Sequence, residues 1–346
     1  MILKNTLFGN LPGGRQARLF TVETSSGLTI CITNYGGIIT SIKMPDQFGN
    51  SEEITAGFPN LEDYLNDHPY FGVIAGRFAN RIAKGKFEIN GKKYSLPINN
   101  GPNHLHGGSQ GFHTRLWNYE ITEKPDHVSI RLTYSSPHLE MGYPGNLKAV
   151  VEYTVLENNV LQISSEAETD LPTHVNLTNH AYFNLSGFKD DVFAHKLFVN
   201  ADHYLELDET QIPTGKNLVC EGTAFDYRAS NEKMSLIREP MDHCFVLNKN
   251  RSLQQPAAIL FHPQSGRQIK LFCTQPGIQV YTGNFLDGSL TGHNGISYGQ
   301  HQAICLETQH FPDTPNRPSF PSTLLNPGEI YRHSSKFVFE TLKGKI

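Results

Sequence analysis

The stretch AVVEYTVLENNVLQISSE, residues 149–166, carries the clearest structural signal in this chain. On both sides of Asn158-Asn159, apolar and β-branched residues alternate with polar ones, and a period of two is typical of half-buried strands. The two asparagines between these runs are a turn signal. The stretch therefore predicts two strands, Ala149–Leu156 and Val160–Ser164, joined by a tight connection.

The same pattern recurs along almost the whole chain. Asn90-Gly91 predicts another tight hairpin, with both turn residues at positive φ, whereas a short helix is predicted only at Asn60–Asp67. Further strands are predicted at Leu19–Glu23, Leu28–Thr33, Ile38–Met44, Val128–Tyr134, Leu197–Val199, Ala257–Phe261, Gln268–Thr274, Ile278–Tyr281, Ala303–Glu307 and Lys336–Leu342.

So many strands without helical crossovers cannot form a parallel α/β sheet. They predict an all-β fold, a large antiparallel β-sandwich. The sequence shows no repeat, no low-complexity linker and no break in composition, so residues 1–346 are expected to form a single domain.

Composition and charge exclude several classes of function. Lys and Arg number 29 and Asp and Glu 33, a formal net charge of −4 without the basic footprint of a nucleic-acid binder. No apolar run is long enough for a transmembrane helix, and the N-terminal residues lack the apolar core of a secretory signal. Five scattered cysteines without a CxxC pair favour reduced thiols over disulfides or a zinc site. We therefore expect a cytoplasmic protein that binds neither nucleic acid nor a membrane. A monomer is favoured, with a dimer as the alternative.

Two histidine-containing segments are candidate functional sites. In NNGPNHLHGG, residues 99–108, His104 and His106 are two positions apart, so in an extended segment both side chains would face the same side. In HVNLTNHAYFN, residues 174–184, His180 stands among amides and aromatic rings, which suit the hydroxyls and C–H faces of a sugar. For both segments, histidines with purely structural partners remain the alternative.

Charged residues next to apolar runs are further candidates. Glu307 ends a buried strand in ICLETQHFPD, so its carboxylate is either paired for structure or tuned for proton transfer. GRFANRI, residues 76–82, supplies Arg81, and Asp242 directly precedes an apolar strand. The motifs GxGxxG, Walker A, GxSxG and HExxH do not occur in the sequence. The two histidines of the HxH, a later histidine and a glutamate could instead ligate a metal ion. The amides and arginine beside them suit a neutral polar ligand better.

Taken together, these segments resemble the aldose 1-epimerase (galactose mutarotase) family. Each fragment is short, but they follow one another in the family's order over nearly the whole chain. The resemblance implies the large antiparallel β-sandwich of that family, with the site in a cleft on one face. The matching stretches are GRFANRI (76–82), NHLHGG (103–108), GYPGN (142–146), NLTNHAYFNL (176–185), Asp242-His243, QVYTGNF (279–285), LETQ (306–309) and FPDTPN (311–316).

The resemblance also implies an activity, the interconversion of α and β anomers of free hexoses such as D-galactose and D-glucose, with neither cofactor nor metal. The family's general base falls on Glu307 and its general acid on His180, with His106 as a further catalytic residue. Its substrate-binding residues fall on Asn80, Arg81, Asp242 and Gln279. Two departures from the family pattern, Cys244 and Val280, remove no proton-transfer group.

Chemistry agrees with these roles, because ring opening requires the C1 hydroxyl to lose a proton while the ring oxygen gains one. Three rival functions remain open from the sequence. A sugar-binding relative without catalysis would be expected to lack the base. A relative acting on phosphorylated hexoses would need several basic groups at one point. A metal-dependent enzyme would lose activity in a chelator. Outside the proton-transfer pair, Arg77, His104, His174 and His243 are expected to be structural.

Overall fold

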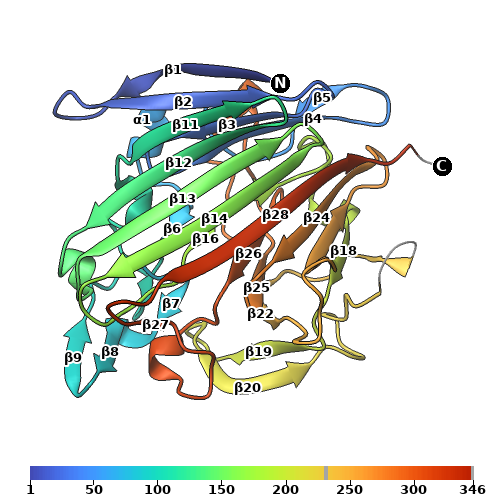
Figure 1. Cartoon of the computed structure of the whole chain (residues 1–346). Helices are drawn as coiled ribbons and strands as arrows, with labels where there is room; N and C mark the ends of the chain where they lie inside the picture. Colours follow the sequence, from blue (N-terminus) through green and yellow to red (C-terminus); the bar gives the residue numbers. More distant parts are fainter. Residues whose placement is uncertain (230–232, 344–346) are drawn as a thin grey trace.

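The computed structural model describes residues 1–229 and 233–343 and is built largely from antiparallel sheets (Figure 1). The longest strands lie side by side in a nine-stranded sheet. In spatial order its strands are β11 (Asn118–Lys124), β12 (His127–Ser136), β13 (Leu147–Leu156), β14 (Val160–Thr169), β28 (Tyr331–Thr341), β24 (Arg267–Cys273), β23 (Ala258–Phe261), β18 (Lys196–Val199) and β21 (Ser235–Leu236).

The hairpin predicted around Asn158-Asn159 forms the middle of this sheet. Strand β13 pairs with β14 in register from Leu147↔Thr169 to Leu156↔Val160, and Asn159 takes a positive φ of 62°. Side chains of β13 at alternate positions, such as Val151, Tyr153 and Val155, are fully buried. Both strands extend beyond their predicted ends.

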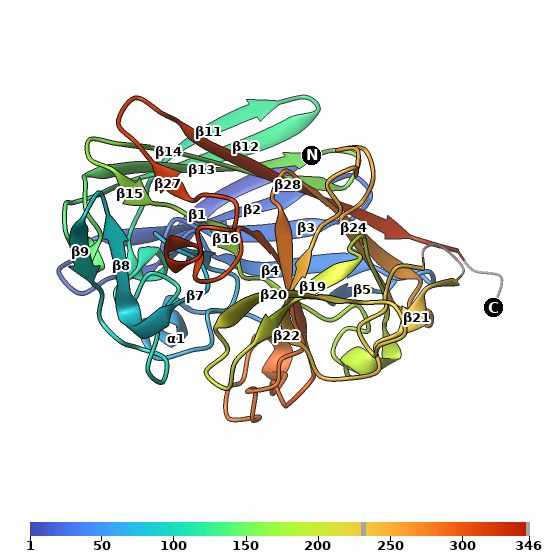
Figure 2. The same ribbon diagram turned by 90° about the horizontal axis from the view of Figure 1, so that it is seen from below.

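A six-stranded sheet provides the surface on which the candidate site lies. Figure 2, a view from below, shows part of this sheet beneath the nine-stranded one. Its strands, in spatial order, are β17 (Tyr182–Phe183), β26 (Ile304–Gln309), β25 (Gly277–Tyr281), β22 (Asp242–Val246), β19 (His203–Leu207) and β20 (Pro213–Val219).

The N-terminal residues form a five-stranded sheet along one side of the molecule (blue in Figure 1). It consists of β1 (Ile2–Asn10), β2 (Gln16–Glu23), β3 (Thr29–Thr33), β4 (Ile39–Pro45) and β5 (Ser51–Glu53). Four short two-stranded pairs complete the sheets, namely β8 (Lys86–Ile89) with β9 (Lys92–Ser95), β7 (Arg81–Ile82) with β10 (His104–Leu105), β6 (Ile74–Ala75) with β16 (Thr178–Asn179), and β15 (Thr173–His174) with β27 (Leu324–Leu325).

Helical structure is limited to short segments. The predicted helix is α1, Leu61–Leu65; Asn60 occupies its N-cap position, but its side chain makes no capping hydrogen bond. Single 3₁₀ turns lie at Ala83–Gly85, Phe112–Thr114, Glu140–Gly142, Val192–Ala194, His293–Gly295 and Thr314–Asn316. Within residues 1–229 and 233–343, no helix is long and apolar enough to cross a membrane.

These observations confirm the all-β antiparallel sandwich. The Asn90-Gly91 turn between β8 and β9 also has the predicted conformation, with φ values of 51° and 79°. One large core cluster contains buried side chains from Phe20 to Phe339, so strands from both ends of the chain contribute to it. The single-domain organisation stays a prediction.

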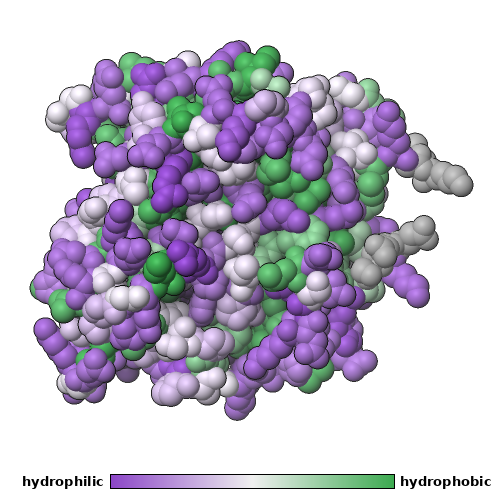
Figure 3. All heavy atoms as spheres, viewed as in Figure 1, coloured by the Kyte–Doolittle hydropathy of each residue, from purple (hydrophilic) through white to green (hydrophobic). Residues whose placement is uncertain are grey.

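The face of the molecule shown in Figure 1 is mostly polar, and apolar side chains gather around its centre and right (Figure 3). A satellite cluster of apolar residues lies on the neighbouring strands β18 and β23, formed by Phe198, Ile259 and Phe261 together with Met234. It is separate from the main core, and Met234, Ile259 and Phe261 line a cleft that is described below.

Candidate functional site

Three neighbouring strands, β22, β25 and β26, form the floor of the candidate site. Gln279 lies directly opposite Glu307 and Cys244 directly opposite Gln279 in the sheet register. Directly opposite residues project from the same face of a sheet, as do residues two apart on one strand. Asp242, Gln279 and Glu307 therefore share one face. Gln279 Nε2 donates a hydrogen bond of 2.6 Å to Asp242 Oδ1.

His180 lies over this floor, on the connection between β16 and β17. Its Nε2 atom is 3.6 Å from Glu307 Oε2, and its Nδ1 atom is 3.5 Å from the Sγ atom of Cys305. The imidazole stacks with the ring of Tyr182 at a centroid distance of 5.1 Å and with that of Tyr70 at 6.1 Å. Its ring is therefore fixed both at its edges and by stacking.

His106 reaches the same place through an unusual backbone conformation. Both His106 and Asn80 have positive φ, 50° and 67°, a conformation that is uncommon outside glycine but tolerated by asparagine and histidine. The two residues bond reciprocally: His106 N donates to Asn80 O, and Asn80 N donates to His106 Nδ1, each at 3.2 Å. Because Nδ1 accepts, the ring proton of neutral His106 is on Nε2. The His106 ring meets that of His180 edge-on at 5.1 Å.

Arg81 links Asn80 and His106 to Asp242 on the floor of the site. Its Nη2 atom lies 3.6 Å from Asp242 Oδ2, and its Nε atom donates to Asn100 Oδ1 at 3.0 Å. The side chain of Asn80 accepts a 2.8 Å hydrogen bond from the backbone N–H of Arg81. The seven predicted residues thus form a closed chain of neighbours, in the order Glu307, His180, His106, Asn80, Arg81, Asp242, Gln279 and back to Glu307.

Burial moves the pKa values of the acid and the imidazoles in opposite directions. The pKa of Glu307 is raised well above its usual value, first by burial and then by the charge of Asp242, while Arg81 opposes the shift. Burial lowers the pKa of His180 to about 4. The pKa of His106 is also lowered well below its usual value, by burial and by the nearby His180 and Arg81. At pH values between these two pKa values, the Glu307–His180 pair therefore holds one proton in total.

Two buried oxygen atoms of this site have no hydrogen-bond partner among the residues that the structure describes. Neither Glu307 Oε2 nor Gln279 Oε1 accepts a hydrogen bond from any residue that the structure describes. Buried polar atoms in proteins are normally hydrogen-bonded, so these two are suited to receive hydroxyl groups of a ligand. Ligand atoms of His106, His180 and Glu307 also lie within 4.8 Å of one another, a spacing that a metal ion could bridge.

The histidines and arginine expected to be structural have partners of their own. His104 is fully buried, and its ring bonds the carbonyl oxygen of Pro97 and the hydroxyl of Tyr143, so it does not join His106. Arg77 donates four hydrogen bonds to Ser136, Pro137 and Pro144. In the same way, His174 bonds Thr323, and His243 packs against the ring of Phe225.

The sequence analysis missed four residues that surround the acid–base pair: Tyr70, Asn100, Tyr182 and Cys305. Two of them had a usable signal. Cys305 is two positions before Glu307, so the period of the strand places both on one face. Tyr182 stands two positions after His180 in a segment already singled out. Asn100 lies in the segment 99–108 already singled out but has no pattern of its own, and Tyr70, ten positions before Asn80, lies outside every segment that was singled out.

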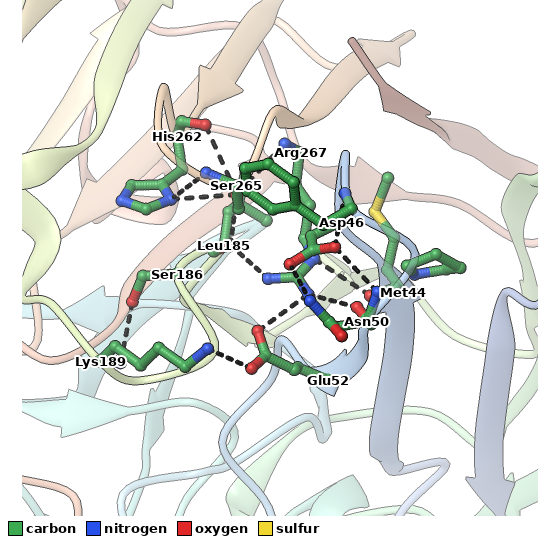
Figure 4. Close-up of polar contacts among 12 residues, drawn as sticks. Met44, Asp46, Asn50, Glu52, Leu185, Ser186, Lys189, His262, Ser265 and Arg267 are labelled. Atoms are coloured by element: carbon green, nitrogen blue, oxygen red, sulfur yellow. Dashed lines mark hydrogen bonds and ion pairs between the residues drawn. The ribbon is translucent and has the colours of Figure 1, made fainter. Parts of the chain in front are cut away.

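A cleft of about 1220 Å³ lies elsewhere, between the β4–β5 and β23–β24 turns. Among its described lining residues is none of the seven predicted site residues. Figure 4 shows the polar contacts beside it, where the fully buried guanidinium of Arg267 donates to the carbonyl oxygens of Met44, Asn50 and Leu185 and to the carboxylate of Glu52. Lys189 binds the same carboxylate. Because these groups satisfy one another, we assign the chemistry to the Glu307–His180 site instead.

A buried carboxylate facing an imidazole, with amides and a guanidinium around them, defines an acid–base site for a polar ligand on an antiparallel β-sandwich. Comparison with known proteins agrees with this class. The sequence model of the aldose 1-epimerase family matches residues 18–338. The chain belongs to this family, whose members are isomerases.

Individual relatives cover nearly the full length of the chain. Galactose mutarotase of Sus scrofa is 44% identical over 340 residues, covering 96% of this chain and 97% of that protein. Aldose 1-epimerase of Escherichia coli K12 is 34% identical over 339 residues, covering 95% and 96%. Among solved structures, an aldose epimerase homologue from C. elegans has a TM-score of 0.87 and 29% identity, covering 94% of this chain and 99% of that one.

Proposed function

We propose that the protein is a mutarotase that interconverts the α and β anomers of free hexoses such as D-galactose and D-glucose. The family and its relatives support this activity. The observation that carries the assignment to particular residues is the 3.6 Å approach of His180 Nε2 to Glu307 Oε2 in a buried site.

In this proposal, Glu307 removes the proton of the C1 hydroxyl while His180 delivers one to the ring oxygen. The C1–O5 bond breaks and C1 becomes an aldehyde carbon. Rotation about C1–C2 then presents the other face of the aldehyde to the O5 hydroxyl. Closure returns the proton of that hydroxyl to His180 and the proton on Glu307 to the new C1 hydroxyl, so both side chains end in their starting states. A positioned acid or base contributes typically 10²–10⁴-fold.

The proton count of the pair fits this cycle. Before opening, the pair carries one proton, on His180; after opening it again carries one, on Glu307. Burial raises the pKa of Glu307 and lowers that of His180, so the proton of the resting pair is favoured on Glu307. It must first pass to His180 Nε2, 3.6 Å away, before Glu307 can act as the base. Each step moves protons between the two residues and the sugar, and none is exchanged with solvent.

The remaining residues would hold the sugar. Arg81 and His106 are placed to donate to its oxygen atoms, and Asp242 and Gln279 to bind hydroxyls away from C1. Asn80 has its side-chain oxygen engaged by the backbone of Arg81. Its role is therefore first to hold Arg81 and His106 in position.

Polarimetry of freshly dissolved α-D-galactose and α-D-glucose tests the function. With protein, in buffer containing a chelator, we expect a faster approach to the same final rotation than without protein. A rate equal to the spontaneous one, from folded protein, would reject the proposal. Activity lost in chelator and restored by a divalent metal would instead favour a metal ion held by His106, His180 and Glu307. A cytoplasmic location and a monomeric state remain predictions.

A further inference from the structure

The ring of Tyr70 contacts three imidazole rings in and beside the site. Its ring centroid lies 4.8 Å from that of His106, 5.0 Å from that of His113 and 6.1 Å from that of His180, with the last pair stacked at 25°. His106 and His180 are each only 5% exposed, whereas Tyr70 is partly exposed. The tyrosine ring is therefore in a position to separate the buried imidazoles from solvent.

The backbone holds Tyr70 in a strained conformation at this position. Its φ is 61°, in the left-handed region that a bulky residue rarely adopts. Local hydrogen bonds stabilise the segment: Tyr70 N donates to His68 O at 2.8 Å, and Phe71 N donates to His68 Nδ1 at 3.2 Å. The hydroxyl of Tyr182 donates to Pro69 O at 2.8 Å. Such strain persists where the surroundings fix it and is concentrated at functional sites.

Resting on the mutarotase activity proposed above, we propose that Tyr70 is a positioning residue of the acid–base site, whose ring keeps water from His180 and His106 and fixes their orientation. It acts through the imidazoles and takes no part in proton transfer. Its own hydroxyl accepts a 3.4 Å hydrogen bond from Asn99 Nδ2, which anchors the ring at its outer end.

Shielding by Tyr70 would affect catalysis because burial controls the pKa of His180. The groups that face His180 are Glu307 and Cys305 from β26, Tyr182 from β17, and Tyr70, His68 and His106 from the loops. Burial is the first cause of the low pKa of His180. A protonated imidazole with a lowered pKa is a stronger acid toward the ring oxygen. Exposure of the ring to water would raise that pKa toward its ordinary value of about 6.5.

Two substitutions of Tyr70 distinguish the shielding by its ring from the hydrogen bond made by its hydroxyl. Tyr70→Phe keeps the ring and loses the bond to Asn99, whereas Tyr70→Ala removes the ring. For Tyr70→Ala we expect kcat to fall on the order of tenfold and the acid limb of its pH profile to move upward into the range pH 5–7. Tyr70→Phe is expected to keep the limb of the unmodified protein. Tyr119→Ala removes a tyrosine that is 38% exposed on the distant strand β11 and serves as the control.

NMR titration of ¹⁵N-histidine-labelled protein gives a second readout that needs no activity. The His180 resonances of Tyr70→Ala are expected to titrate at higher pH than those of Tyr70→Phe. If Tyr70→Ala does not fold, Tyr70→Asn takes its place, because asparagine tolerates the positive φ of this position and is too small to cover the imidazoles. Unchanged titration of His180 and an unchanged acid limb in a folded ring-free variant would overturn the proposal. Absence of mutarotase activity together with a shifted titration would reject the proposed function but keep the shielding role.

Discussion

His180 Nε2 lies 3.6 Å from Glu307 Oε2, although the two residues are 127 positions apart in sequence, His180 on the connection between β16 and β17 and Glu307 on β26. Both side chains are nearly inaccessible, 6% and 3% exposed. Their opposite pKa shifts leave a single proton on the pair. The pair is thus poised to take one proton from a sugar and give one to it without exchange with bulk water.

Removal of either member of the pair is expected to abolish most of the activity. Glu307→Gln keeps the shape of the side chain and removes the base; His180→Ala removes the acid. Each is expected to lower kcat by about 10²–10⁴-fold, measured by polarimetry on protein whose circular dichroism matches the unmodified chain. Near-normal turnover in either folded variant would show that the acid–base assignment is wrong.

Asp242 and Arg81 are expected to move the alkaline limb of the pH profile in opposite directions. The charge of Asp242 raises the pKa of Glu307 and that of Arg81 lowers it. Asp242→Asn therefore lowers the pH at which the pair loses its last proton, and Arg81→Gln raises it. Measurement of kcat from pH 6 to 10 checks both signs, and shifts in the same direction for both variants would contradict this account. Both variants are also expected to raise KM.

The thiol of Cys305 is expected to select the tautomer of His180. Burial raises the pKa of this thiol well above its usual value, so the group stays protonated, and its sulfur can accept from Nδ1–H at 3.5 Å. The neutral ring then has Nε2 free to accept a proton on the side of Glu307. Cys305→Ser keeps an acceptor, whereas Cys305→Ala does not. Histidine ¹⁵N chemical shifts are expected to show the Nδ1–H form in the unmodified protein and in Cys305→Ser, and a mixture in Cys305→Ala.

Arg267 is expected to matter for stability and not for catalysis. Replacement by Met leaves the Glu52 carboxylate and three carbonyl oxygens without this donor, and breaking a buried ion pair costs about 3–5 kcal/mol. The control is Arg332→Met, because Arg332 pairs with Glu166 on the surface at 63% and 42% exposure and such pairs contribute about 1 kcal/mol or less. Urea unfolding compares the two. Equal losses would contradict the structural role given to Arg267.

The fold was predictable where strands are half-buried and where a turn requires particular residues. β13, β14 and the Asn90-Gly91 hairpin follow from period-two alternation and turn chemistry. β1 and β11 were missed because most of their residues are exposed, so they lack the alternation that burial imposes.

At the site, each of the seven residues came from a resemblance in short motifs, and the structure brings the seven together. The left-handed backbone at His106 and Tyr70 left no trace in the sequence pattern, because neither position is glycine. In an extended segment His104 and His106 would face the same side, but the chain turns at His106 and their rings have different surroundings.

Strand β28 occupies the middle of the nine-stranded sheet, between β14 and β24, and its residues 331–338 pair with residues 160–167. During synthesis, β11 to β14 can pair as successive hairpins. The free edge of β14, however, has no partner until β28 has been synthesised. An unpaired edge is a template for pairing with other chains. Between the synthesis of β14 and that of β28, this edge is therefore the part of the sheet most exposed to pairing with another chain.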